Sequence, residues 1–380
     1  MSSSKPCRPD SSGIIDDLLN LILLRLHVKS LLRCKAVSKP WCSLISSSLF
    51  INSHYTRAIT SPGADQTFIL RNQEDGSFSL LRLSPSPIVA ELKFPYSQGE
   101  YPVMPKSVLI GSAKGIACVS VSLDKSSYCD KCPPDIYLWN PATRQSRLLP
   151  PQNVYCSRSS VESCGFGYDP INNDFKVVVV FHYPHRVDVY STNMNAWQKA
   201  GRLPPDTYFG QFSVCFEGFL CWNRLIGIVA FDLNREVFNC DTKFPDGLSN
   251  DGHTYLRITD FNYSVAVIKE EGFYGKTKLW MLDNVKCLLR GGGVASWTLI
   301  VSIDAADLPI PYVRSYFNNG DFLLISNDHN CFSYDSDKKE AKKLHITNSF
   351  VGGQMSKFTE SLVSIPGSRP VEWNAHEDNN

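Results

Sequence analysis

The chain has 380 residues, of which 38 are basic and 37 are acidic, so its formal net charge is +1. This balance gives no long-range field of the kind that holds nucleic acid or a membrane surface, and we expect neither as a partner. The length suggests one small and one large domain, or one large fold with an appendage.

Residues 1–13 are polar and rich in serine, and the apolar run after them is interrupted by Asn20 and Arg25. This pattern is typical neither of a signal peptide nor of a membrane span. Without a secretory signal, the 13 cysteines are expected to be reduced thiols, most of them small core residues. We therefore expect a protein of the cytoplasm, the nucleus or both, and not a secreted one.

Residues 14–51 predict a small helical unit. Apolar residues at helical spacing form one stripe between Ile14 and Leu26, and Leu21, Leu23 and Leu24 widen it beyond one packing face. Roughly forty residues bury too little surface to cover both faces internally. The second surface belongs either to the rest of this chain or to another protein, and the pattern alone does not choose between them.

The residue order of this unit is more specific than its pattern. Residues 17–19, 22–26, 28–33 and 37–45 resemble a plant-type F-box. The resemblance implies a three-helix module that docks on a Skp-family adaptor and, through it, on a cullin-RING ubiquitin ligase. The residues to which it assigns adaptor binding are Ile14, Ile15, Leu18, Leu19, Ile22, Leu23, Leu26, Val28, Leu31, Leu32, Val37 and Trp41.

The unit departs from the family at two places. Family members usually begin with Leu-Pro where this chain has Ile14-Ile15, and they carry proline where it has His27. The first departure loses a helix-starting proline, and the second loses a rigid turn between helices. Ser38 is expected to cap a third helix with Pro40 in its first turn.

Five basic residues and no acidic one lie between residues 25 and 39. They form either solvated helix surface or a surface complementary to an acidic partner, which would speed docking more than tighten it.

After the helical unit, short apolar segments separated by Gly, Pro, Asn and Asp predict an all-β region from about residue 53 onward. Corresponding positions of its repeats are 51, 41, 50 and 53 residues apart, at Trp139, Tyr190, Phe231, Met281 and Tyr334. This is a propeller-blade period. The alternative is a β-sandwich or barrel with coincidental spacing, and the number of blades stays open.

An apolar segment precedes the turn of each repeat, and we expect these segments to be the inner strands of the blades. They are residues 115–121, 175–181, 218–222, 263–268 and 320–325. A terminal strand at residues 359–364 is expected to close the ring against the first blade, which removes free sheet edges.

Five motifs in the β region resemble the plant F-box-associated domain. They are Gly111-Ser-Ala-Lys-Gly-Ile, Leu138-Trp-Asn-Pro-Ala-Thr-Arg, Gly165-Phe-Gly-Tyr-Asp-Pro, Phe175-Lys-Val-Val and Thr359-Glu-Ser-Leu-Val-Ser. The resemblance implies a kelch-like β-propeller that captures the substrate of the ligase. This chain has Ala113-Lys114 where the family often has Cys-Asn, and we expect that departure to change a turn and little else.

The expected fold is therefore mainly β with a small N-terminal all-α module, an F-box three-helix unit followed by a kelch-like β-propeller. We expect residues 1–9 to be disordered, residues 10–55 to form the F-box module, residues 60–365 to form the propeller, and residues 366–380 to be a disordered tail.

Candidate sites outside the helical unit are few. Cys129 and Cys132 form a C-x-x-C motif, but no second pair follows at zinc spacing, so we expect no metal and no cofactor. Propeller loops carry function and aromatic residues dominate interface hot spots. The candidate substrate-binding residues are the loop aromatics Tyr208, Phe209, Tyr274, Tyr312 and Tyr316.

These features predict a substrate-receptor subunit of a Skp-cullin-F-box ubiquitin ligase that binds an unidentified target protein and is not itself an enzyme. One alternative is an adaptor-independent β-propeller scaffold whose helices pack on its own propeller. Another is a propeller-type sugar binder or metal oxidase, and an enzyme of this kind should show converging side chains with a bound metal or cofactor.

Overall fold

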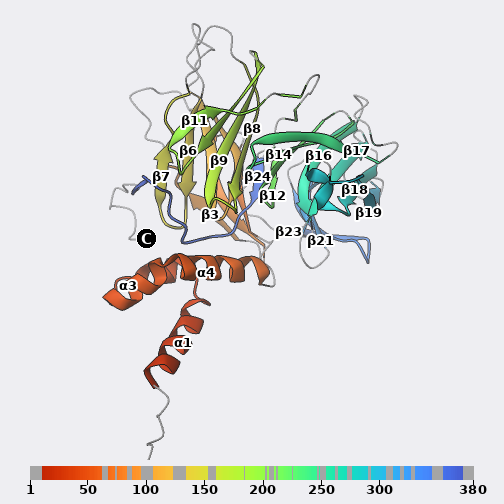
Figure 1. Cartoon of the computed structure of the whole chain (residues 1–380). Helices are drawn as coiled ribbons and strands as arrows, with labels where there is room; N and C mark the ends of the chain where they lie inside the picture. Colours follow the sequence, from red (N-terminus) through yellow and green to blue (C-terminus); the bar gives the residue numbers. More distant parts are fainter. Residues whose placement is uncertain are drawn as a thin grey trace, which may run out of the picture.

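The computed structural model consists of a set of N-terminal helices followed by β-sheets (Figure 1). The residues that the structure describes are 11–61, 67–72, 75–83, 88–95, 106–122, 134–152, 160–183, 185–201, 203–204, 209–210, 213–224, 226–245, 248, 254–261, 264–271, 276–289, 292–304, 311–316, 321–326, 330–344 and 354–370.

The helices of the N-terminal module are α1 (Ser11–Leu23), α2 (Val28–Cys34), α3 (Lys39–Ser46) and α4 (Ser48–Thr60). The F-box resemblance implies three helices, so α4 is an additional one. It continues past residue 55, where we expected the module to end. The helical period of α4 is weak in the sequence because its buried residues are only Phe50 and His54.

The start of α3 follows the expected capping chemistry. The side-chain oxygen of Ser38 accepts a hydrogen bond from the backbone amide of Trp41 at 3.3 Å, and Pro40 lies in the first turn. A serine at this position satisfies one of the amides that have no partner inside the helix. The fixed φ of proline suits the first turn.

Six antiparallel sheets form the blades of a β-propeller, with strand orders β24-β1-β2-β3, β4-β5-β6-β7-β25, β8-β9-β10-β11, β12-β13-β14-β15, β16-β17-β18-β19 and β20-β21-β22-β23. The strands are β1 (Thr67–Arg71), β2 (Phe78–Arg82), β3 (Ile88–Leu92), β4 (Lys106–Ala113), β5 (Ile116–Ser122), β6 (Asp135–Asn140), β7 (Gln145–Leu148), β8 (Ser160–Asp169), β9 (Asp174–Tyr183), β10 (Arg186–Ser191), β11 (Ala196–Lys199), β12 (Val214–Phe216), β13 (Phe219–Asn223), β14 (Gly227–Asp232), β15 (Val237–Lys243), β16 (Thr254–Phe261), β17 (Ser264–Glu271), β18 (Lys276–Leu282), β19 (Trp297–Asp304), β20 (Pro311–Tyr316), β21 (Asp321–Ser326), β22 (Cys331–Asp335), β23 (Glu340–Leu344), β24 (Gln354–Lys357) and β25 (Arg369–Pro370). A 3-10 helix, η2 (Val285–Leu288), lies between β18 and β19.

The innermost strands are not the ones that we expected. β4 contacts β24 and β8, and β12 contacts β8 and β16, so these strands lie nearest the axis. The apolar segments singled out in the sequence instead form β5, β9, β13, β17 and β21, one place further out. Neighbouring blades cover a second strand on both faces, and every residue of β5 except the last is buried. Burial on both faces produces the continuous apolar run.

The repeat itself is confirmed. Trp139, Tyr190, Phe231, Met281 and Tyr334 each occupy the second-to-last position of the third strand of a blade, in β6, β10, β14, β18 and β22. Equivalent residues therefore recur at equivalent places in five blades. The sixth blade, β24-β1-β2-β3, combines both ends of the β region and has no counterpart in that series.

The turn after the third strand recurs as well. The side-chain oxygens of Asp232 and Asp335 each accept hydrogen bonds from two backbone amides of the turn, at 2.9 to 3.0 Å. The fourth residue after each aspartate, Glu236 or Lys339, has a positive φ of 55° or 57°. An aspartate that bonds its own turn makes this geometry possible without glycine.

The ring is closed by β24, which pairs with β1. We expected the closing strand at residues 359–364, but residues 358–365 have no regular secondary structure. This segment instead lies between the two parts: Leu362 is buried in the helical core, and Ile365 is buried in a core of the propeller. Beyond it, β25 pairs with the outer strand β7, inside the tail that we expected to lack structure.

A buried charged group joins the blade of β8 and β9 to the blade of β14 and β15. The Lys176 ammonium lies 2.8 Å from a carboxylate oxygen of Glu236 and 3.8 Å from one of Asp169. It also donates a hydrogen bond to the backbone oxygen of Leu233 at 2.5 Å. The Lys176 side chain is only 6% exposed, so its charge is compensated almost entirely by these oxygens.

Candidate functional site

Helix α1 projects away from the propeller, whereas α3 and α4 lie along the end of the propeller (Figure 1). Exposed apolar side chains form a face on α1. Leu18, Leu21 and Ile22 are 56%, 54% and 57% exposed. Their spacing of three and four residues puts them on one side of the helix. Contiguous exposed apolar surface marks an interaction site. We call Leu18, Leu21 and Ile22 the α1 face.

The other residues predicted to bind an adaptor have different surroundings. Val37 is exposed, and the side chains of Ile14 and Ile15 lie outside the described part of the structure. The remaining candidates are buried or half-buried in the core of the module itself, namely Leu19, Leu23, Leu26, Val28, Leu31, Leu32 and Trp41. The resemblance therefore assigned to a partner several side chains that the chain covers by itself.

Leu21 was missing from the predicted adaptor-binding residues. Its signal was present, because it lies three residues after Leu18 and widens the apolar stripe of the sequence. Leu23, by contrast, is 1% exposed.

The basic segment lies next to the α1 face in the sequence. Arg25, Lys29, Arg33 and Lys39 are exposed, and Lys35 is half-buried. Exposed charges of one sign beside an apolar face favour a partner with an acidic rim.

The helical module is fixed to the propeller by specific contacts. Leu362, from the segment after β24, is buried in the helical core, and Ala142, from the turn between β6 and β7, packs against that core. Tyr55 of α4 lies near Lys114 in the turn between β4 and β5, with 5.9 Å from the ammonium to the ring centre. Burial raises the pKa of Tyr55 to about 12.

Within the helical module, His54 of α4 is hydrogen-bonded through Nε2 to the backbone oxygen of Leu26 at 2.8 Å.

Lys114 has a larger role than we expected. Its ammonium also lies 3.9 Å from the ring centre of Tyr168, at the end of β8. A cation held against two aromatic rings is stabilised by their negative faces. The departure Ala113-Lys114, expected to change only a turn, thus supplies a contact between the propeller and the helical module.

The helical module and the connections between blades lie at opposite ends of the propeller. In each antiparallel blade, the turns after the first and third strands share one end, and Lys114 and Ala142 place that end against the helices. The connections between blades leave the other end. Loops there are the usual place for recognition residues.

Of the five predicted substrate-binding aromatics, Phe209 is the one whose side chain the structure describes. Tyr208 and Tyr274 lie outside the described residues. Phe209 is 2% exposed and packs edge-on against Trp222, with ring centres 5.7 Å apart, so it belongs to the core.

The other two aromatics were expected on loops, but both lie within β20, where Tyr312 pairs with Ile325 and Tyr316 pairs with Phe322. They fall near opposite ends of one strand. The composition of residues 311–316 did not distinguish a strand from a loop. The innermost strands of the blades are less continuously apolar than the second strands, so their sequence signal is weaker.

The second departure from the F-box pattern, His27 in place of proline, has backbone dihedral angles that suit proline. His27 precedes α2 with φ −64° and ψ 151° and makes no side-chain capping bond. Proline fixes φ near this value. The backbone therefore keeps the geometry that proline would impose, without the ring.

Buried thiols are unsuited to chemistry in this fold. Burial raises the pKa of Cys164 to about 12 and that of Cys215 to about 11. A protonated thiol is neither a good nucleophile nor a metal ligand. Among the described residues, no three His, Cys, Asp or Glu side chains are grouped so that they could hold a metal ion. Cys129 and Cys132 lie outside that part of the chain.

No described helix is long and apolar enough to cross a membrane.

Two family profiles match the chain. The profile described as "F-box associated beta propeller domain" matches residues 45–288, more than half of the chain, and the profile described as "F-box domain" matches residues 12–53. An N-terminal F-box followed by this propeller defines a class of plant F-box proteins. The chain belongs to the F-box-associated β-propeller family.

Curated relatives agree with this assignment. F-box protein CPR1 of Arabidopsis thaliana is 29% identical over 269 residues, which cover 62% of this chain and 60% of that protein. F-box/kelch-repeat protein At3g23880 of the same plant is 28% identical over 243 residues, covering 58% and 63%. F-box protein At4g22390, also from Arabidopsis thaliana, is 27% identical over 361 residues, covering 84% and 82%. The chain thus spans less than two thirds of the first two relatives.

Proposed function

We propose that this protein is the substrate receptor of a Skp-cullin-F-box ubiquitin ligase. The α1 face binds a Skp-family adaptor, the adaptor links it to a cullin-RING ligase, and the propeller binds a target protein for ubiquitination and degradation. The exposed apolar face on an F-box helix that points away from the propeller is the observation that carries this proposal.

The arrangement of the two surfaces supports the proposal. Adaptor contacts at the helical end leave the opposite end of the propeller open to a target. The receptor acts by holding the target near the transfer machinery, which raises its local concentration. It is non-catalytic, requires no cofactor of its own, and works in the cytoplasm, the nucleus or both.

Co-purification of the full-length chain with a Skp-family adaptor tests the proposal. A stable complex of defined stoichiometry is expected, and a chain that elutes without the adaptor contradicts it. Targets are then sought by proximity labelling with a Leu18→Asp plus Ile22→Asp variant, because a receptor that cannot reach the ligase retains proteins that it can no longer deliver.

An adaptor-independent scaffold is the second candidate. The burial of Leu23, Val28 and Leu31 within the chain favours it, because those side chains are unavailable to a partner. The α1 face distinguishes the two candidates. In a scaffold, aspartates at Leu18 and Ile22 leave partner binding unchanged, whereas in a receptor they remove adaptor binding.

A further inference from the structure

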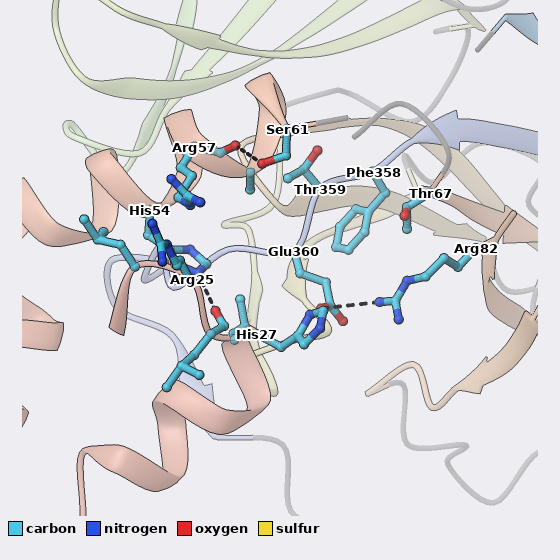
Figure 2. A pocket seen from close by; sticks show the side chains of 14 residues that line it. Arg25, His27, His54, Arg57, Ser61, Thr67, Arg82, Phe358, Thr359 and Glu360 are labelled. Atoms are coloured by element: carbon cyan, nitrogen blue, oxygen red, sulfur yellow. Dashed lines mark hydrogen bonds and ion pairs between the residues drawn. The ribbon is translucent and has the colours of Figure 1, made fainter. Parts of the chain in front are cut away.

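A pocket of about 300 Å³ lies between the helical module and the propeller. Its walls come from three separate regions of the chain: the helices, strands β1 and β2 of the sixth blade, and the segment that follows β24 (Figure 2). This volume is at the lower limit of pockets that hold small molecules.

The charges around the pocket are unbalanced. Arg25 from the turn after α1, Arg57 from α4 and Arg82 from β2 all line it, and Glu360 is the single acidic residue among its described lining residues. Arg82 lies 3.8 Å from Glu360. Arg25 and Arg57 form no ion pair within the described part of the chain. Three guanidinium groups and one carboxylate leave a net charge of +2.

Part of the pocket lining is apolar, and the other uncharged or neutral lining residues are His27, His54, Ser61, Thr67 and Thr359. Phe358 is buried, and its backbone amide donates a hydrogen bond to the Thr67 backbone oxygen at 2.9 Å, which fixes it against β1. Leu24 and Leu26 line the pocket from the helical side. Figure 2 shows Arg25 and Arg57 on one side of the pocket and Arg82 on the other, with Phe358 between them.

We propose that this pocket binds the phosphate group of a small organic phosphate, with the organic part against Phe358. A phosphomonoester carries about −1.5 to −2 charges at pH 7, which matches the net charge of the lining. Arginine forks bind phosphate through paired N–H groups. The pocket is a partly open cleft between two parts of the chain, and its size admits a small molecule and excludes a folded protein surface.

A ligand in this pocket would affect how the helical module is held on the propeller. The ligand bridges α4 and the sixth blade, so it binds only when the helices are docked on the propeller. By linkage, a ligand that binds only the docked state stabilises that state. The proposed phosphate therefore strengthens the placement of the F-box relative to the propeller, independently of adaptor binding.

Isothermal titration calorimetry of the full-length chain tests the proposal. The probes are phenyl phosphate, inorganic phosphate and phenol, at constant ionic strength. Phenyl phosphate is expected to bind saturably at one site and to raise the thermal midpoint of unfolding. Inorganic phosphate is expected to bind more weakly, because it lacks the apolar part, and phenol is expected not to bind.

Three variants locate the site. Arg57→Gln and Arg82→Gln are each expected to weaken phenyl phosphate binding about tenfold or more, because each removes charge-assisted hydrogen bonds. Arg33→Gln, on exposed α2 surface away from the pocket, is the matched control and is expected to bind as the wild type does. Circular dichroism checks that each variant is folded.

The proposal is overturned if phenyl phosphate does not bind the folded wild-type chain. It is also overturned if Arg57→Gln and Arg82→Gln, shown to be folded, bind it as tightly as Arg33→Gln does. Binding that is equally strong for phenol would show that the apolar wall, and not the arginines, selects the ligand, and would contradict the assignment.

Discussion

Lys114 and Tyr55 join the two parts of this protein, since the Lys114 ammonium on a propeller turn lies 5.9 Å from the centre of the Tyr55 ring on α4. The backbone of Lys114 is also held, because its carbonyl oxygen accepts a hydrogen bond from the Ser361 hydroxyl at 2.5 Å. The same turn therefore contacts the helices and the segment that follows the closing strand. Its chemistry leads to the first two predictions.

Stability at high pH should depend on Tyr55. Burial raises the pKa of its hydroxyl to about 12, against about 10 in the unfolded chain. Above pH 10 the unfolded state loses this proton while the folded state keeps it, so stability falls as pH rises from 10 toward 12. The expected loss between pH 9 and pH 11.5 is about 2 kcal/mol, measured by urea unfolding.

Tyr55→Phe is the control for this prediction. It removes the titrating hydroxyl and keeps the ring, so it should lose about 2 kcal/mol less than the wild type over the same pH range. Parallel losses in the two proteins would show that Tyr55 ionises freely in the folded state.

Gly115, the second residue of the same turn, should not tolerate a side chain. It has φ +76°, and a Cβ there would lie 2.4 Å from the Ser361 hydroxyl and 2.7 Å from the Thr359 carbonyl oxygen. Gly115→Ala is therefore expected to lower stability by about 2 kcal/mol or more. Gly201→Ala is the matched control, because its nearest neighbour is at 3.7 Å, and its thermal midpoint should stay near that of the wild type.

Loss of the buried ammonium of Lys176 should be costly. Lys176→Met leaves Asp169 and Glu236 without their cation, and breaking a buried pair costs about 3–5 kcal/mol. The urea midpoint is the readout. Lys338→Met is the matched control, because Lys338 pairs with Asp335 in a similar turn but is 70% exposed; its midpoint should be unchanged. Equal effects of the two substitutions would contradict the role of burial.

The Asp169 carboxylate, which pairs with Lys176, makes the stability of the fold sensitive to acid. Burial raises the pKa of Asp169, but hydrogen bonds from the Asn172 side chain and from nearby backbone amides outweigh it, so the net pKa lies below the ordinary value. A carboxylate with a lowered pKa stabilises the fold above its unfolded pKa of about 3.9, and that contribution is lost as pH falls through the folded-state pKa.

Replacement of His27 by proline should stabilise the helical module. The backbone already has φ −64°, so His27→Pro mainly restricts the unfolded chain, which is worth about 0.4–1 kcal/mol. A rise in the thermal midpoint is the expected result. A fall would mean that the backbone before His27 is incompatible with proline.

The propeller could be predicted because its signal is local and repeated. Trp139 and its four counterparts recur at equivalent strand positions, and Asx residues such as Asp232 form the following turns. The order of strands from the axis could not be predicted, because continuous apolar segments show burial on both faces without showing what covers them. The closing strand lies earlier in the chain than expected because residues 354–357 pair with β1, whereas Leu362 is buried in the helical core and the Ser361 and Val363 backbone oxygens accept hydrogen bonds from Asn140.

The candidate site was only partly predictable for a similar reason. Helical spacing identified Leu18 and Ile22, but it could not separate them from Leu23, which lies on the same amphipathic helix. Leu23 belongs to a core that also contains Leu362, more than 300 residues away in the sequence. Which apolar residues of α1 remain exposed is therefore decided by a tertiary contact.

The affinity of the full-length chain for a purified Skp-family adaptor tests the central claim most directly. The wild type should bind, and Leu18→Asp plus Ile22→Asp should weaken binding at least about a hundredfold without changing the thermal midpoint. Val294→Asp, at an exposed site on the propeller, should bind as the wild type does. No binding by the wild type, or equal affinity of the α1-face variant, would contradict the assignment of α1 as the adaptor-binding surface.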